Sequence, residues 1–315
     1  MSFRKSYKLI SKHPIRWFPG HMGKGLKQMQ QKLKAVDCVI EVHDARIPFS
    51  GRNPDFQQTL IGDNVKPHIL VLNKKDLITN KDQANIKEIL AKNERLKHVL
   101  FTNCKDQQCT GIKRLMPLAN EIISNSARYN REGEKDFCVM IAGVPNVGKS
   151  SLINVLRNRN LRKKSAAQVG GIAGITRSVM EKIKISENPL MYMIDTPGIL
   201  EPKIKNDEMG MKLAAVGCLP DHLVGEDLIA DYLLYWLNKN SRFEYVNLVG
   251  LEKPTDNISE LLITYAEKLS VRRKLRQNDG QLLIMPDILH SSREFIKLFR
   301  QKKLGRINLD SQLST

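Results

Sequence analysis

The sequence lacks an acidic residue before Asp37, an apolar run long enough to cross a membrane, and a paired-cysteine motif. Apolar runs such as residues 137–144 are far shorter than the ~20 residues of a transmembrane helix, which excludes the membrane-spanning class. The five cysteines include no Cys-x-x-Cys pair and no metal-ligand spacing, so they predict no structural metal site. We interpret them as reduced thiols of an intracellular protein.

The positive charge is extreme. The chain has 51 Lys and Arg against 33 Asp and Glu, a formal net charge of +18 and a pI near 9.7. Nucleic acid is the first candidate for a polyanionic partner, and an anionic membrane surface is the alternative. Nine cations precede the first acid: Arg4, Lys5, Lys8, Lys12, Arg16, Lys24, Lys27, Lys32 and Lys34. Such a start is typical of an organellar import segment and equally of a basic arm that grips RNA, and the sequence leaves both open.

Length and pattern predict a soluble protein with a parallel α/β domain followed by a helical one. The 315 residues exceed the ~250 at which single cores stop growing, and short apolar runs alternate with polar helical stretches. We expect strands at residues 36–42, 68–72, 98–102, 137–142, 179–185 and 190–194, and helices at 53–60, 83–93, 111–126 and from 150. We also expect a polar linker at 130–136, a mobile acid-free loop at 157–177 and amphipathic helices such as 227–237. The predicted units are a basic N-terminal segment (1–35), an α/β domain (36–206) and a helical RNA-binding domain (207–315).

Residues Gly143–Ser150 (GVPNVGKS) match the phosphate-binding P-loop pattern between a predicted strand and a predicted helix. Backbone N–H groups of such a loop surround phosphates at a helix N-terminus. Lys149 would contact the β- and γ-phosphates, and the Ser150 hydroxyl would bind Mg²⁺. The remaining predicted nucleotide contacts of this loop are Gly143, Asn146, Val147, Gly148 and Ser151.

The base specificity is predicted by Asn73-Lys74-Lys75-Asp76, an N-K-x-D motif at the end of an apolar strand. The Asp76 carboxylate can accept hydrogen bonds from N1–H and N2–H₂ of guanine, donors that adenine lacks. We expect Asn73 to contact the base and the loop, and the Lys74 stem to lie over the ring. A second guanine loop is expected at Thr102–Lys105, where Asn103 and Cys104 replace the Ser and Ala of the common S-A-K motif and Lys105 completes it.

Asp195-Thr-Pro-Gly198 ends another predicted strand and matches the start of the switch II segment of GTPases. Asp195 would bind Mg²⁺ through water, and the Gly198 amide would sense the γ-phosphate. Thr176, in the basic loop, is the candidate switch I ligand of Mg²⁺. Lys149, Thr176 and Gly198 are thus the candidate catalytic residues.

The order of these motifs is unusual, because both guanine motifs precede the P-loop. The only downstream candidate, Asn238–Ser241, lacks the Asp. A circularly permuted GTPase domain solves this, with the linker joining the former chain ends and the new ends opening after switch II. The fold prediction is therefore α/β: a permuted P-loop GTPase domain, mostly parallel sheet with helices on both faces, and a C-terminal helical domain.

Together with the segments Arg16–Met22 (RWFPGHM), Asp44–Pro48 (DARIP) and Asp221–Leu237, these motifs make the chain resemble the circularly permuted ribosome-assembly GTPases of the YlqF-related family, in its mitochondrial ribosome-associated branch. The resemblance implies GTP or GDP with Mg²⁺ as ligands, and the large mitochondrial ribosomal subunit with its rRNA as partner. It also implies a location in the mitochondrial matrix. Peripheral contact with the inner membrane, as in a membrane signalling GTPase, is the alternative. Asp44-Ala-Arg46 is typical of the family, and we interpret it as loop structure.

Ile199 stands where many GTPases have a glutamine that orients water, so slow intrinsic hydrolysis is expected. The resemblance offers two substitutes: Asn146, matching the asparagine that helps to hold K⁺ in potassium-activated GTPases, and His21, matching a histidine associated with hydrolysis. A packing role is the alternative for His21. If hydrolysis is negligible, the alternative function is an RNA-binding assembly scaffold with structural GTP.

Residues 271–306 carry ten basic residues against three acids, which favours an RNA-facing patch over a merely solvated helix face. The ten are Arg272, Arg273, Lys274, Arg276, Arg293, Lys297, Arg300, Lys302, Lys303 and Arg306. No signature of base-specific RNA reading accompanies them.

Overall fold

The computed structural model describes residues 3–9, 32–52, 66–93, 96–129, 131–161, 182–196, 204, 206–276 and 282–311. The helix expected at 53–60 lies outside the described residues. The loop expected at 157–177 is partly corrected, because helix α5 continues to Leu161.

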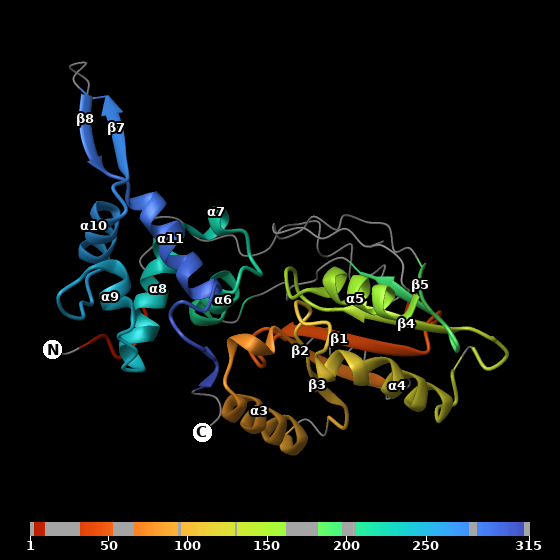
Figure 1. Cartoon of the computed structure of the whole chain (residues 1–315). Helices are drawn as coiled ribbons and strands as arrows, with labels where there is room; N and C mark the ends of the chain where they lie inside the picture. The colour runs from red at the N-terminus through yellow and green to blue at the C-terminus, as the bar shows by residue number, and fades with distance from the viewer. Residues whose placement is uncertain are drawn as a thin grey trace.

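A six-stranded sheet forms the first half of the molecule (Figure 1). Its strands are β1 (Cys38–Asp44), β2 (His68–Asn73), β3 (Val99–Phe101), β4 (Phe137–Ala142), β5 (Lys182–Glu187) and β6 (Leu190–Asp195). They are ordered β3-β2-β1-β4-β6-β5, and only β5 is antiparallel to its neighbour. Each expected strand is present, and the mostly parallel sheet is confirmed.

Helices cover both faces of this sheet. The alternate residues Ile40 and Val42 of β1 share a core with α4 (Thr110–Ser124) and α5 (Lys149–Leu161). Leu70 and Leu72 of β2 face the other way, toward α3 (Asn80–Asn93). Strand residues point alternately to opposite faces, so these near-continuous apolar runs are buried on both sides, as parallel strands require.

Specific contacts hold the linker that the permutation predicts against the sheet. After α4, residues 125–136 lead to β4, and their arginines reach the buried carboxylate of Asp37 at the start of β1. Arg128 Nε and Arg131 Nε donate to it at 3.1 and 3.0 Å, and the Cys138 amide of β4 donates at 2.7 Å. One acid thus fastens the linker to the two central strands.

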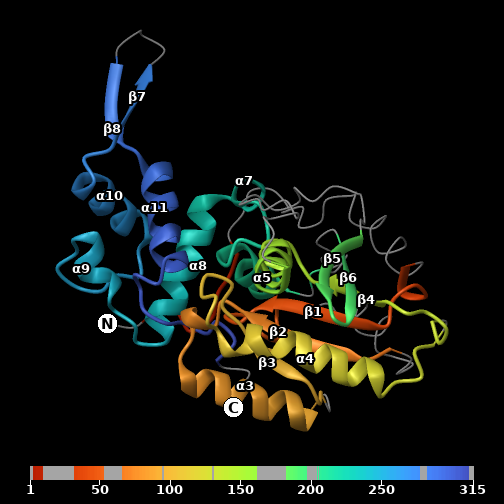
Figure 2. The same cartoon turned by 45° about the vertical axis from the view of Figure 1, so that its right-hand side comes forward.

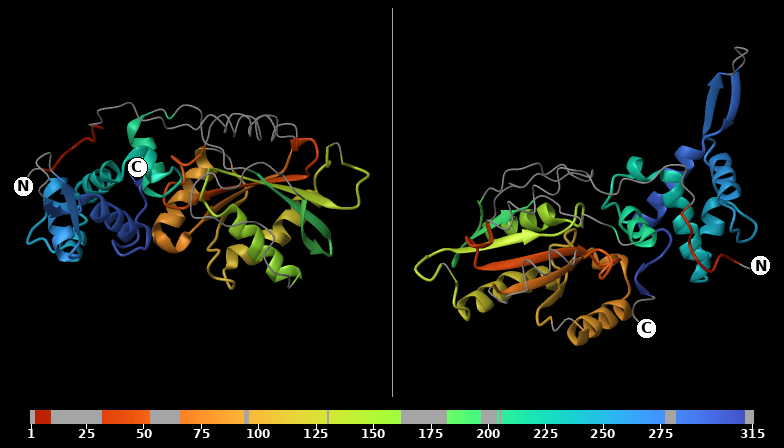
Figure 3. Two further views of the ribbon diagram at one scale, coloured as in Figure 1. Left: turned by 90° about the horizontal axis from the view of Figure 1, so that it is seen from above. Right: turned by 180° about the vertical axis from the view of Figure 1, so that it is seen from behind.

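The second half of the chain is mainly helical (Figures 1 and 3). Its helices are α6 (Asp207–Ala215), α7 (Asp221–Val224), α8 (Glu226–Lys239), α9 (Tyr245–Val249), α10 (Ile258–Lys268) and α11 (Ile288–Arg300). The prediction of helices alone was incomplete, because β7 (Arg272–Arg276) and β8 (Leu282–Pro286) form an antiparallel hairpin that projects from α10 and α11 (Figure 2). The helix face that we considered for Arg272, Arg273 and Lys274 was wrong, since they lie on a strand.

Both ends of the described chain pack back onto the body. Near the N-terminus, Arg4 forms ion pairs with Asp231 of α8 and with Asp256, at 2.9 and 3.0 Å. At the other end, the amides of Ile307 and Leu309 donate to the carbonyls of Leu77 and Arg46, at 3.0 and 2.8 Å. The tail of the second half is therefore bonded to loops of the first half.

In the part of the chain that the structure describes, every helix is too short or too polar to cross a membrane.

We predict that Asp37→Asn lowers the free energy of unfolding by about 3 kcal/mol, because the half-buried Arg128 and the buried Arg131 lose the buried carboxylate that they share. Chemical denaturation followed by circular dichroism measures this change. The matched control is Glu88→Gln, which removes an exposed ion pair with Lys92 on α3 and should change stability little. Equal midpoints for the two variants would show that the Asp37 cluster does not hold the linker against the sheet.

Candidate functional site

The loops that follow β1, β2, β3, β4 and β6 meet at one edge of the sheet, because these strands are parallel. The central strands β1 and β4 are neighbours, yet the strand order continues in opposite directions from them: β1 is followed by β2 on one flank of the sheet, and β4 by β5 and β6 on the other. Ligands of open α/β sheets bind at such a switch point. The structure thus brings the P-loop, both guanine loops and Asp195 to one place.

Two glycines let the P-loop (residues 143–150) pass close to its neighbours. Gly143 has a φ of 144°, and a Cβ there would lie 2.1 Å from the Val42 carbonyl oxygen of β1. Gly148 has a φ of 99°, and its Cβ would meet the Asn73 amide nitrogen at 2.3 Å. A side chain at either position would force the loop away from the strand or from the guanine motif.

Lys149 opens helix α5 and is buried. Its ammonium group donates to the carbonyls of Gly143 and Val144 at 3.1 and 3.0 Å, inside the loop. Burial lowers the pKa of Lys149 to about 8, although the nearby Asp195 acts in the opposite direction. The ammonium is thus held in the loop where phosphate oxygens would replace the carbonyl partners.

Ser150 and Asp195 form a pair that fits a divalent cation. The Ser150 hydroxyl donates to Asp195 Oδ2 at 2.9 Å, while the buried Oδ1 has no hydrogen-bond partner among the described residues. Burial raises the pKa of Asp195, and Lys149 and Ser150 offset this only in part. No cluster of three or more His, Cys, Asp or Glu suited to a metal occurs in the described parts of the chain. A carboxylate and a hydroxyl beside a phosphate site are the sparse donor set that suits Mg²⁺.

Asn73 ties three loops together. Its side-chain nitrogen donates to the Val147 carbonyl of the P-loop at 2.8 Å. Its oxygen accepts from the Thr102 hydroxyl and the Cys104 thiol, at 3.1 and 3.3 Å. The predicted contacts of Asn73 with the loop are therefore present, whereas its contact with the base stays a prediction.

The rest of the N-K-x-D motif lies on a left-handed residue and a short helix. Lys74 has a φ of 60°, and the 3-10 helix η1 (Lys75–Leu77) follows, with the Lys75 amide bonded to the Thr102 carbonyl at 3.0 Å. Lys75 and Asp76 are half-buried, so the Asp76 carboxylate is accessible to a ligand.

The sequence interpretation assigned Asp44 and Arg46 to loop structure, and the structure corrects this for Asp44, which is the last residue of β1. Asp44 is fully buried at the end of β1 and pairs with the Lys74 ammonium at 2.8 Å, which also donates to the Asn146 carbonyl at 2.9 Å. Arg46 Nε and Nη2 donate to the same carboxylate at 2.9 and 2.7 Å. Burial alone would raise the pKa of Asp44, but the two cations hold it well below its ordinary value. An acid ending a buried strand was the signal that pointed to this role.

The second guanine loop follows β3. Asn103 Oδ1 accepts from the Lys105 amide at 3.0 Å, forming a turn that leaves Lys105 exposed. Cys104 is half-buried, and burial raises the pKa of its thiol to about 12, so it stays protonated. The backbone of this turn thus lies next to Asn73.

Asn146 has a φ of 58°, a left-handed conformation that asparagine adopts more easily than most residues. Its side-chain nitrogen donates to the Gly217 carbonyl at 2.8 Å. Val147 is buried and Ser151 half-buried, the latter in the first turn of α5. His21, Thr176 and Gly198 lie outside the described residues, as does Ile199, so their roles stay predictions.

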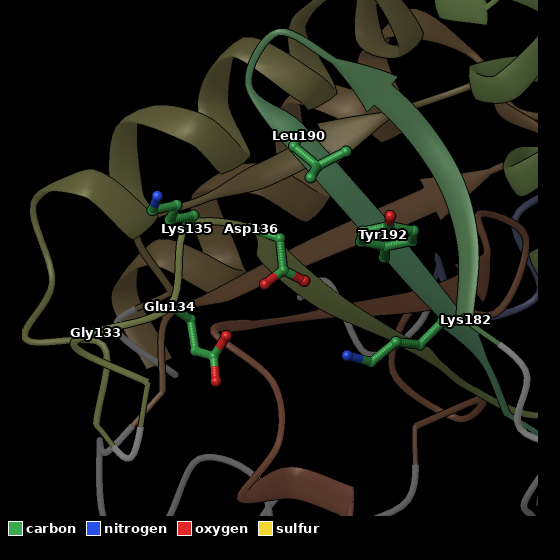
Figure 4. A pocket seen from close by; sticks show the side chains of 7 residues that line it. All are labelled: Gly133, Glu134, Lys135, Asp136, Lys182, Leu190 and Tyr192. Carbon is green, nitrogen blue, oxygen red and sulfur yellow. The ribbon is translucent and has the colours of Figure 1, made fainter.

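A separate hollow of about 620 Å³ lies beside the starts of β4 and β6 (Figure 4). Its lining residues are Gly133, Glu134, Lys135, Asp136, Lys182, Leu190 and Tyr192. These residues belong to the linker and to the β5–β6 edge, and none belongs to the predicted nucleotide loops. The hollow is therefore not the candidate site.

Comparisons with known proteins agree with this geometry. Residues 138–241 match the family model described as a 50S ribosome-binding GTPase. The chain is 58% identical over 310 residues to the protein named Mitochondrial GTPase 1 of Aedes aegypti, covering 98% of each chain. It is 48% identical over 316 residues to Mitochondrial ribosome-associated GTPase 1 of Bos taurus, covering 99% of this chain and 93% of that one.

Among solved structures, the fold resembles the GNP-bound YlqF of T. maritima with a TM-score of 0.56 and 24% identity. The match covers 91% of this chain and 97% of that chain. From the reordered motifs, the single nucleotide edge of the sheet and these matches along nearly its whole length, we conclude that the chain belongs to the mitochondrial ribosome-associated GTPase 1 family of circularly permuted GTPases.

Proposed function

We propose that this GTPase is an assembly factor for the large subunit of the mitochondrial ribosome, and that it binds rRNA in a nucleotide-dependent way. The observation that supports nucleotide binding is the set of hydrogen bonds between loops at one edge of the sheet. Asn73 donates to the P-loop, and Ser150 donates to Asp195. The names of its relatives support the ribosomal and mitochondrial parts. The matrix is the proposed location.

The chain's own residues supply most of the chemistry. Lys149 would neutralise charge on the β- and γ-phosphates, while Asp76 would accept two hydrogen bonds from guanine. Ser150 and Asp195, with Thr176, would hold Mg²⁺, which supplies charge stabilisation at the phosphates when bound. Gly198 would sense the γ-phosphate, and His21 is the proposed aid to hydrolysis. Asn146 is the proposed ligand of K⁺.

The RNA contact is best assigned to the β7–β8 hairpin. Arg272, Arg273, Lys274 and Arg276 are exposed on β7 and form no ion pair among the described residues. By contrast, Arg293, Lys297 and Arg300 of α11 are paired with Glu226, Glu294 and Asp221. Four cations without an ion pair thus lie on the projecting hairpin, where a phosphate backbone could reach them. Among the described residues, Lys302, Lys303 and Arg306 after α11 form no ion pair either.

Exposed apolar side chains line the neighbouring strand. Leu282 and Ile284 of β8 are 64% and 54% exposed. A basic strand beside an exposed apolar strand also suits an anionic membrane surface, so peripheral contact with the inner membrane is the alternative to RNA. Salt washing and carbonate extraction of mitochondria distinguish the two, because membrane docking would survive removal of ribosomal subunits.

The first prediction of this function concerns Asp76. Asp76→Asn replaces an acceptor with an amide, so affinity should fall for GTP and rise for xanthosine triphosphate, which presents an acceptor in place of the guanine amino group. Fluorescent-nucleotide titrations measure both affinities. GTP binding as tight as in the parent would refute the assignment of residues 73–76 to guanine.

The second prediction concerns Lys149. Lys149→Ala should slow GTP hydrolysis by at least about 100-fold, since the charge at the phosphates is lost. In the parent, whose Lys149 pKa lies near 8, the ammonium is protonated below this pH and loses its charge above it, so GDP affinity should decrease as the pH rises past 8. Lys149→Ala should lack this decrease. Unchanged turnover in the variant would exclude the P-loop as the active site.

The third prediction concerns the hairpin. Changing Arg272, Arg273 and Lys274 together to Glu should weaken binding to large-subunit particles and flatten the dependence of log K on log salt by about 2 to 3, because each lost duplex-phosphate contact contributes about 0.9. Intrinsic GTP hydrolysis should stay near the parent rate. Filter binding over a salt series provides the slopes.

The charge-matched control changes Lys81, Lys87 and Lys92 on the exposed side of α3 to Glu. It should leave most of the salt dependence intact. Equal losses in the two triple variants would indicate a diffuse charge effect, and no loss in the hairpin variant would refute the assignment. Equal particle affinity of the GTP-analogue and GDP forms of the parent would favour the scaffold alternative.

A further inference from the structure

The last two residues of α6 and the turn that follows them (residues 214–218, together called the turn) lie directly against the P-loop. The Gly217 carbonyl accepts from Asn146 Nδ2 at 2.8 Å, and the Val216 carbonyl accepts from Arg46 Nη2 at 3.4 Å. Gly217 has a φ of 84°, so the turn depends on a residue without a side chain there. A segment from the second half of the chain therefore contacts the nucleotide loops through backbone carbonyls.

A carbonyl fixes the orientation of the amide that it faces. It can only accept, so the Asn146 side chain must turn its nitrogen toward Gly217. The oxygen Oδ1, the one atom of this side chain that can bind a cation, is then directed by the same contact. The position of the turn consequently sets where Asn146 presents its oxygen.

Arg300, the last residue of α11, holds this turn from the other side. Nη2 donates to the Ala214 carbonyl at 2.8 Å and Nε to the Ala215 carbonyl at 3.0 Å. Nη1 and Nη2 also bind the Asp221 carboxylate, at 2.8 and 2.6 Å. The guanidinium lies over Gly217, where an added Cβ would be 3.5 Å from its central carbon. One planar group thus joins the end of α6, the turn and the start of α7.

The residue before it makes a second connection. The guanidinium carbon of Arg46 lies 5.0 Å from the ring centre of Phe299, within the range of a cation–π contact. The turn and Arg46 both contact the nucleotide loops. The last two residues of α11 therefore contact both: Arg300 the turn, and Phe299 the side chain of Arg46.

The opposite end of α11 adjoins the hairpin. Strand β8 runs directly into Asp287, whose side chain caps α11 by accepting from the His290 amide at 2.9 Å, and whose own amide donates to Val271 at 3.1 Å. The helix packs on α8 and α10, and its Phe295 and Ile296 are buried in the apolar core. Its 13 residues span about 20 Å as a packed, rigid element.

We propose that Arg300 is a positioning residue for Asn146: by holding the turn at residues 214–218 it orients the asparagine oxygen for the monovalent cation. The inference rests on the proposed K⁺ role of Asn146. It also gives RNA at the hairpin a physical route to the P-loop, because α11 joins the two places. A purely structural role would affect stability alone, whereas a positioning role changes the response to K⁺.

The test measures GTP hydrolysis against K⁺ concentration, with Na⁺ keeping ionic strength constant, for the full-length parent and Arg300→Gln. We expect the half-saturating K⁺ concentration to rise by about threefold to tenfold, equivalent to about 0.7 to 1.4 kcal/mol of lost coupling. The rate at saturating K⁺ and the affinity for fluorescent GDP should stay within about twofold.

The matched control is Arg242→Gln. Arg242 is similarly exposed, at 30% against 28% for Arg300, and likewise pairs with a carboxylate, Glu244, and donates to the Leu304 carbonyl. Its hydrogen bonds and ion pairs among the described residues include none to a nucleotide loop. It should respond to K⁺ like the parent. An unchanged half-saturating concentration in folded Arg300→Gln, or an equal shift in Arg242→Gln, would overturn the inference.

Arg300→Lys guards against a loss of folding. It keeps the charge for Asp221 but cannot hold all four oxygens in the plane of a guanidinium, so it should retain the parent melting temperature more closely and still shift the K⁺ response. A parent that hydrolyses GTP equally in K⁺ and Na⁺ would overturn the inference and the K⁺ role together while leaving the GTPase proposal standing. A parent without any hydrolysis would refute that wider proposal.

Discussion

The buried carboxylate of Asp44 is the constraint on which the nucleotide edge of this molecule depends. A lone carboxylate in an apolar interior is very unfavourable, so it must be matched by cations of fixed geometry. Lys74 comes from the guanine loop, and Arg46 reaches the turn at Val216. A single charge therefore sets the positions of the guanine loop, the P-loop asparagine beside Lys74, and the second half of the chain.

Circular permutation explains why the second half is so closely involved. The chain leaves the sheet after β6, where the predicted switch II begins. Near its C-terminus it returns to the loops after β1 and β2, where the amides of Leu309 and Ile307 donate to the carbonyls of Arg46 and Leu77. Asp310 is fully buried and accepts from the amides of Phe49 and Ser50 at 2.9 and 2.8 Å, and from Lys212 of α6 at 3.0 Å. One continuous apolar core includes Val144 of the P-loop and Phe299 of α11. The helical half is thus bonded to the first half at both its beginning and its end, which suits its proposed response to bound nucleotide.

Much of the fold could be predicted from local pattern. Strand β4 has the predicted bounds, because it is a continuous apolar run. Helix α8 lies where the amphipathic stretch indicated, because its apolar residues repeat with the period of a helix. The hairpin could not be predicted in this way. Its strands read RRKLR and LLIMP, neither of which alternates apolar with polar residues. Helix α5 was predicted too short because the residues at its end are basic and polar, a composition that also suits a loop.

The sequence by itself determined the identity of the site, because each nucleotide motif is a short run of residues whose spacing is dictated by the ligand. It also determined the permutation, since the order of motifs is a property of the chain. Only the tertiary structure decided what surrounds those motifs: the pairing of Asp44 with Lys74 and Arg46, the bond from Asn146 to Gly217, and the grip of Arg300 on that turn. Apart from the pairing of Asp44 with Arg46, these contacts join residues far apart in the chain, through backbone carbonyls and a buried charge. A backbone carbonyl carries no residue identity, so no sequence pattern could have revealed it.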